Sequence, residues 1–91
     1  MMVTRRITIH GCVQGVGYRA SMAQQAGKLG LTGWIRNRLD GSVEACVQGP
    51  EQSIEIIVEW AKHGPRLARV EQVVVTEDAG DYSGFILQPT V

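Results

Sequence analysis

The chain opens with an alternation of apolar and polar residues, the pattern of a half-buried β-strand. Ile7 and Ile9 point to one side of this segment, and His10 points to the other. Small and apolar residues then recur at helical spacing as far as Leu29, and Gly30 follows them, where a helix end is expected. The first third of the chain is therefore predicted to form a strand and then a helix.

The middle of the chain has the pattern of a β-hairpin followed by a second helix. Asp40–Gly41 is a strong turn signal between two strand-like runs. Gly49–Pro50 breaks the second run and opens a helix that Gly64–Pro65 ends. The apolar stripe of this helix consists of Ile54, Ile57, Val58 and Ala61.

The last third predicts a fourth strand in "VEQVVVTE", a turn-rich piece in "DAGDYSG" and a short fifth strand in "FIL". The resulting order is βαββαβ. Two helices with one apolar stripe each can cover only one face of a sheet. We therefore expect an α+β, ferredoxin-like split β-α-β sandwich, with an antiparallel sheet of four to five strands and both helices on one face. The length suits one domain over residues 1–91.

Composition narrows the classes of partner. Nine basic residues balance nine acidic ones, so the chain has no net positive charge that would attract nucleic acid or an anionic membrane. No apolar run approaches the roughly 18 residues of a membrane helix, and the N-terminus lacks the apolar core of a signal peptide. We expect a cytoplasmic monomer that binds neither nucleic acid nor membrane. Two cysteines, Cys12 and Cys46, are too few and too far apart for a zinc site, so no metal is expected.

The stretch "HGCVQGVGYR" carries the candidate chemistry. Gly11, Gly15 and Gly17 tolerate positive φ, which allows successive N–H groups to converge on one anion. The stretch leads directly into the first predicted helix, whose N-terminal N–H groups would add to such a site. Arg19 at the helix start can offer a planar, two-pronged donor to a phosphate or carboxylate.

Other interpretations of this stretch remain open on the residues alone. The glycines can form a simple strand-to-helix turn with Arg19 in solvent. Neither G-x-G-x-x-G nor a P-loop is present. A cysteine phosphatase loop needs one fewer residue than the six that separate Cys12 from Arg19. A disulfide between Cys12 and Cys46 is geometrically conceivable, because strand parity places both on the helix-free face, although a reducing cytoplasm argues against it.

Two stretches together resemble the signature motifs of the acylphosphatase family. The first is "GCVQGVGYR", and the second is "GWIRNRLDGSVEACVQG". "LGLTGW" and the segment from residue 64 to residue 75 also resemble the family, so the similarity spans essentially the whole chain. The departures are Ile35, where smaller residues are usual, Tyr18 in place of Phe, and the lack of a basic residue after "FIL". Both motifs are intact.

The resemblance implies hydrolysis of small-molecule acyl phosphates to a carboxylate and phosphate, without a metal or other cofactor. It implies that Arg19 binds the phosphate and that Asn37 orients the attacking water. The substrate-binding residues implied are Cys12, Val13, Gln14, Gly15, Val16, Gly17, Tyr18 and Arg19. Without the resemblance, Asn37 would be read as an ordinary polar residue of a hairpin strand. The alternative function is a non-catalytic, anion-binding or regulatory module on the same fold.

Overall fold

The computed structural model describes residues 1–91, which form five strands and two helices. Each helix spans 11 residues, and neither is long and apolar enough to cross a membrane. The elements are β1 (Met2–Cys12), α1 (Tyr18–Lys28), β2 (Thr32–Asn37), β3 (Val43–Pro50), α2 (Glu51–Ala61), β4 (Arg69–Glu77) and β5 (Phe85–Leu87).

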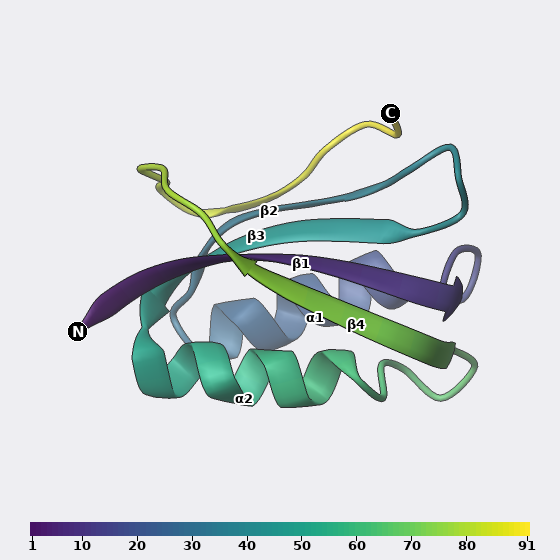
Figure 1. The fold of residues 1–91 in the computed structure, drawn as a ribbon, viewed down its shortest axis with the longest axis horizontal. Helices are drawn as coiled ribbons and strands as arrows, with labels where there is room; N and C mark the ends of the chain where they lie inside the picture. Colours follow the sequence, from purple (N-terminus) through teal and green to yellow (C-terminus); the bar gives the residue numbers. More distant parts are fainter.

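The strands form one sheet in the order β4-β1-β3-β2-β5 (Figure 1). The predicted βαββαβ order is confirmed, and β1 pairs with β3. An antiparallel sheet was predicted, and the first four strands form one. The fifth strand departs from the prediction, because β5 runs parallel to β2, with Gly33 opposite Phe85. The strand directions alternate from β4 through β1 and β3 to β2, so β4 runs opposite to β2. The chain reverses after β4 and enters β5, at the opposite edge of the sheet, in the direction of β2.

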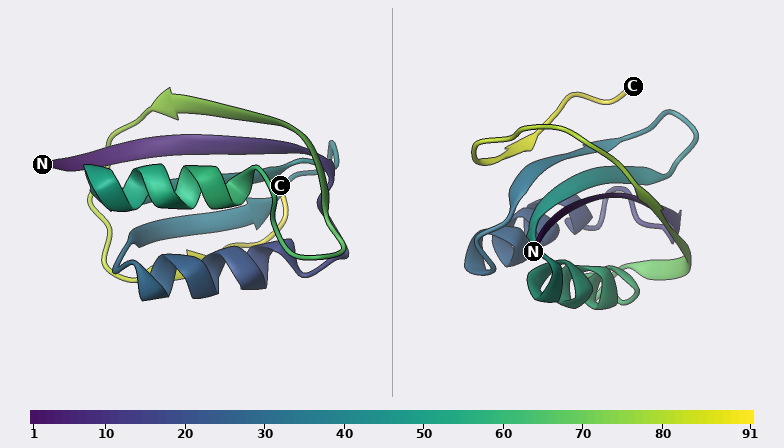
Figure 2. Two further views of the ribbon diagram at one scale, coloured as in Figure 1. Left: turned by 90° about the horizontal axis from the view of Figure 1, so that it is seen from below. Right: turned by 60° about the vertical axis from the view of Figure 1, so that its left-hand side comes forward.

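Both helices lie side by side on one face of the sheet, as predicted (Figure 2). The alternating residues of the central strands face them and are fully buried, including Ile7 and Ile9 from β1. The helices contribute Met22 and Ala26 from α1 and Ile57 from α2, all inaccessible to solvent. The core is therefore a single layer between the sheet and the helix pair, and the site is built at one end of that layer.

A strap, residues 78–84, crosses the face of the sheet that the helices leave free (Figure 1). It has to cross because β4 and β5 are the two edge strands. Tyr82 of the strap places its hydroxyl 3.5 Å from the Cys46 Sγ, and Gln48 Nε2 donates to the Gly80 carbonyl at 2.6 Å. Cys46 was expected on an uncovered face, but it is fully buried beneath this strap.

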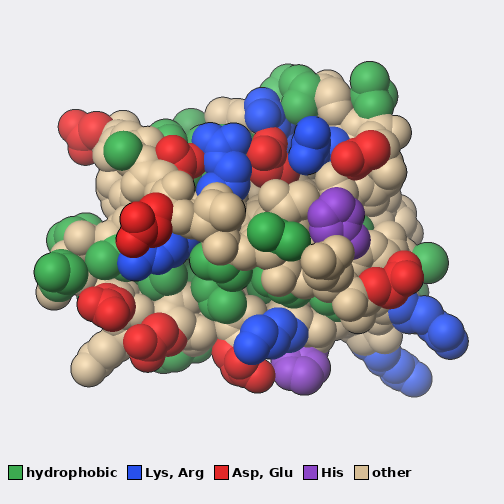
Figure 3. Space-filling view, viewed as in Figure 1, with side chains coloured by type: hydrophobic (Ala, Val, Ile, Leu, Met, Phe, Trp, Pro, Cys, Tyr) green, Lys and Arg blue, Asp and Glu red, His purple; other side chains and the backbone are tan.

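A charged network, Arg6, Arg36, Glu44 and Asp78, lies on the same helix-free face. Glu44 accepts from Arg6 at 3.1 Å and from Arg36 at 2.7 Å, and Asp78 binds Arg6 at 2.7 Å. Both guanidinium groups also lie over the Trp34 ring, at 5.2 Å and 4.7 Å from its centroid. Figure 3 shows basic and acidic side chains alternating along this upper side of the molecule. Every member of the network has a partner.

Candidate active site

The turn between β1 and α1 is a cradle loop, residues 13–17, whose shape depends on glycine. Gly15 and Gly17 have φ angles of 74° and 79°, in the left-handed region that favours glycine. Gly11 serves a different purpose, because a side chain there would collide with the Arg69 backbone in β4. It lies where the β1–β4 register shifts by a bulge. Gly15 and Gly17 turn the chain sharply from the sheet into the first helix, and Gly11 allows β4 to pack closely against β1.

The backbone N–H groups of the cradle loop and the first turn of α1 have no partner in the chain. None from Val13 to Ala20 donates a hydrogen bond, and the first to do so is Ser21, to the Gly17 carbonyl at 3.0 Å. No side chain caps α1, and no acidic residue lies in its first turn. An uncapped helix start carries partial positive charge. The segment therefore offers a continuous run of free donors to an anion.

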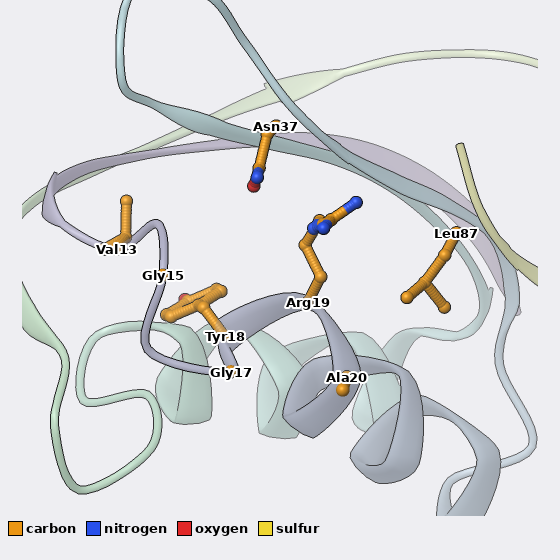
Figure 4. A pocket seen from close by; sticks show the side chains of 8 residues that line it. All are labelled: Val13, Gly15, Gly17, Tyr18, Arg19, Ala20, Asn37 and Leu87. Carbon is orange, nitrogen blue, oxygen red and sulfur yellow. The ribbon is translucent and has the colours of Figure 1, made fainter. Parts of the chain in front are cut away.

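Arg19 lies in the first turn of α1 and extends into a pocket of about 170 Å³ beside the cradle loop (Figure 4). Its guanidinium makes no hydrogen bond or ion pair with any other residue. Leu87 of β5 forms the far wall of the pocket, on the other side of Arg19 from Val13. The pocket thus combines backbone donors, one free cation and an apolar wall.

Asn37 is the last residue of β2, and its amide points toward the cradle loop (Figure 4). Its backbone carbonyl accepts from the Val91 N–H at 3.2 Å, which ties this end of the strand to the C-terminal segment. Its side-chain Oδ1 is buried and has no hydrogen-bond partner. Such an atom costs free energy unless another molecule satisfies it. The pocket therefore presents a free acceptor opposite its free donors.

The side chain of Tyr18 packs into the core below the pocket. Its hydroxyl donates to the Ala61 carbonyl at 2.7 Å, and its ring lies 5.4 Å from that of Trp60. Burial raises the pKa of this hydroxyl above its ordinary range. The contact anchors the start of α1 on the end of α2, which holds Arg19 in place.

The structure brings together most of the predicted site residues. Those that line the pocket are Val13, Gly15, Gly17, Tyr18, Arg19 and Asn37. Three others do not line it. Cys12 is exposed at the end of β1, Val16 packs against the hydrophobic core, and the Gln14 side chain bonds to the β2–β3 hairpin.

Two lining residues, Ala20 and Leu87, were not predicted. Ala20 directly follows Arg19 in the helix, so its place beside the pocket could have been inferred from that predicted neighbour. Leu87 reaches the pocket because β5 pairs with β2, which no local pattern in the sequence indicated.

The two cysteines lie far apart, and both are free. Cys46 pairs across the sheet with Arg6, which is six residues from Cys12 along β1. That separation corresponds to about 20 Å, too long for a disulfide. The disulfide considered from strand parity is therefore wrong, because parity determines the face of a residue and not its position along the strand.

Comparisons with known proteins agree on one family. A family model described as Acylphosphatase matches residues 5–86. An acylphosphatase of Thiobacillus denitrificans is 54% identical over 84 residues, which cover 92% of this chain and 94% of that protein. Among solved structures, an acylphosphatase from Coxiella burnetii has a TM-score of 0.92 at 39% identity and covers 96% of this chain and 93% of its own. One from Bacillus subtilis has a TM-score of 0.90 at 37% identity, with 97% and 99% covered.

Proposed function

The chain belongs to the acylphosphatase family, enzymes that hydrolyse acyl phosphates, and we propose that it does so by direct attack of a water on phosphorus. In this proposal the cradle loop and Arg19 bind the phosphoryl group, and Asn37 orients the water. One observation carries it: six of the eight residues with free N–H groups between Val13 and Ala20 line the same pocket as Asn37, whose Oδ1 is buried and unpaired.

Binding of the phosphoryl group follows from the donors. Its oxygens are acceptors only, and they match the loop N–H groups, the first turn of α1 and the Arg19 fork. Phosphoryl transfer relies on positioning and charge stabilisation more than on covalent help from the protein. The Leu87 side chain has no hydrogen-bonding group, so it does not compete with the phosphate for the donors. Its apolar surface gives the acyl group a wall to lie against.

The Asn37 amide suits the role of orienting a water. Its Oδ1 can accept a hydrogen bond from the water, which leaves a lone pair of the water oxygen directed at phosphorus. The water oxygen bonds to phosphorus, and the bond from phosphorus to the acyl oxygen breaks with its electron pair on the carboxylate. The water proton passes to solvent. The leaving carboxylic acid has a pKa near 4, so it departs as an anion without a general acid.

Hydrolysis of benzoyl phosphate in ¹⁸O-labelled water tests this proposal, with the location of the label read by mass spectrometry. Attack at phosphorus places the label in inorganic phosphate, whereas attack at the carbonyl places it in benzoate. Label in benzoate would contradict the proposed mechanism even if hydrolysis is fast.

Two controls separate the proposal from its alternatives. A metal chelator should leave the rate unchanged, and p-nitrophenyl phosphate should be spared because its leaving group is a poorer one. A folded wild-type protein that binds inorganic phosphate but does not hydrolyse benzoyl phosphate would favour the non-catalytic, anion-binding module.

A further inference from the structure

The Gln14 side chain joins the cradle loop to the β2–β3 hairpin. Its Nε2 donates to two carbonyls at once, that of Arg38 at 2.7 Å and that of Ser42 at 2.9 Å. These carbonyls are at the two ends of the hairpin turn, and the Ser42 carbonyl also accepts from the Arg38 N–H at 2.9 Å. A single amide therefore holds the turn closed and ties it to the loop.

The Gln14 amide provides the direct hydrogen bonds between the cradle loop and the hairpin turn, which is otherwise tied to the C-terminal segment by the Leu39 N–H and the Val91 carbonyl at 2.7 Å. The turn is ordered within itself, since Asp40 Oδ1 accepts from both the N–H and the hydroxyl of Ser42, at 2.9 Å and 2.6 Å. No other side-chain hydrogen bond joins the hairpin turn to the cradle loop. Asn37 directly precedes Arg38, so the clamp acts one residue from the amide that faces the pocket.

We propose that Gln14 is a positioning residue that sets the distance between the phosphate cradle and Asn37. The inference rests on the proposed function, in which the water held by Asn37 has to meet the phosphorus held by the loop. Catalytic geometry of this kind tolerates errors of only about 0.5 Å. The Gln14 side chain acts at a distance from the substrate, because its amide is bound to the hairpin and Gln14 does not line the pocket.

Gln14→Met tests the clamp, since methionine keeps the length of the side chain and lacks the donor. We expect kcat for benzoyl phosphate to fall about tenfold, because a small misplacement of reacting groups is costly. The inhibition constant of inorganic phosphate should change less than about twofold, since the cradle itself is intact.

A double-mutant cycle with Asn37→Ala distinguishes positioning from general loosening. If Gln14 acts through Asn37, Gln14→Met should lower kcat by less than about twofold once Asn37 is alanine. Additive effects would overturn the proposal, and so would a phosphate inhibition constant that rises in step with the loss of kcat. Gln14→Leu, which also lacks the amide donors and adds no charge beside the cradle, provides the same test if the methionine variant does not fold.

Gln48 offers a matched control. Its Nε2 also donates twice, to the Thr4 hydroxyl at 2.8 Å and the Gly80 carbonyl at 2.6 Å, but it ties the strap to the helix-free face. Gln48→Met should lower the melting temperature and leave kcat unchanged. An active wild type whose Gln14→Met variant keeps its kcat would contradict the clamp alone. An inactive wild type would contradict both the clamp and the proposed function.

Discussion

Two regions of this protein use arginine in opposite ways. On the helix-free face, Arg6 and Arg36 are bound to Glu44, and Arg6 also to Asp78. In the pocket, Arg19 has no partner and lies in the first turn of a helix, where a cation is unfavourable. The paired arginines are neutralised within the fold, whereas the unpaired one lies at a helix start where its charge is opposed by the helix dipole.

The comparison extends from arginine to the other polar groups. Near the charged network, the side chains of Gln48, Tyr82 and Cys46 all have partners. Around the pocket, the loop N–H groups and the Asn37 Oδ1 have none. Buried polar groups are normally satisfied, so the buried, unpaired Asn37 Oδ1 beside a run of free N–H donors indicates a ligand site. Functional sites commonly sacrifice stability in this way.

Arg19→Ala is expected to have the largest effect. It should reduce kcat/KM for benzoyl phosphate by about 10³-fold, by analogy with other cations that stabilise a phosphoryl transition state. Its melting temperature without phosphate should not fall, because Arg19 bonds to nothing in the folded chain. Arg66→Ala removes an exposed arginine from outside the pocket and serves as the control, with unchanged kinetics. A clear loss of stability in Arg19→Ala would break the contrast between the two regions.

Asn37→Ala is expected to have the next largest effect, a fall in kcat of about 10²-fold with little change in KM. The substitution removes a buried, unpaired oxygen, so the free energy of unfolding should not decrease. Steady-state kinetics and urea unfolding of the same preparation measure both. A large rise in KM with unchanged kcat would exclude the water-orienting role.

Glu44→Gln should show the reverse behaviour, with stability lost and activity kept. Glu44 is buried and accepts from both Arg6 and Arg36, so loss of its charge leaves Arg36 without an anion and Arg6 with Asp78 alone. We expect a loss of about 2 kcal/mol in the free energy of unfolding, less than for a fully buried pair because the arginines are partly exposed. The kcat for benzoyl phosphate should be unchanged. A variant that loses activity while keeping its stability would place the network in the catalytic machinery.

The smallest expected effect is the pH dependence of stability. Burial opposes the charge on Glu44, but hydrogen bonds from Arg36 and Arg6 outweigh it and hold its pKa below the ordinary 4.5. A lowered pKa in the folded state contributes stability above the unfolded pKa, and that stability is lost as pH falls through the folded value. The free energy of unfolding should therefore decline below about pH 4.5, and less steeply in Glu44→Gln. Parallel curves for the two proteins would contradict this assignment.

Much of the fold was predictable because its signals are local. The alternation at Ile7 and Ile9, the turn at Asp40–Gly41 and the helix end at Gly30 each depend on a few neighbouring residues. The same is true of the cradle loop and Arg19, which are continuous in sequence. Asn37 could be selected only through the resemblance to a family, because its burial and its lack of a partner arise from packing against distant segments.

The sequence by itself determined the order of elements, the glycines that bend the cradle loop and the residue types of the site. Only the tertiary structure decided that β5 runs parallel to β2 and brings Leu87 to the pocket, and that the strap buries Cys46. It also decided that the Gln14 amide serves the hairpin and not the substrate pocket. The physical reason is that backbone conformation follows local sterics, whereas hydrogen-bond partners and burial depend on which distant segments the fold brings together.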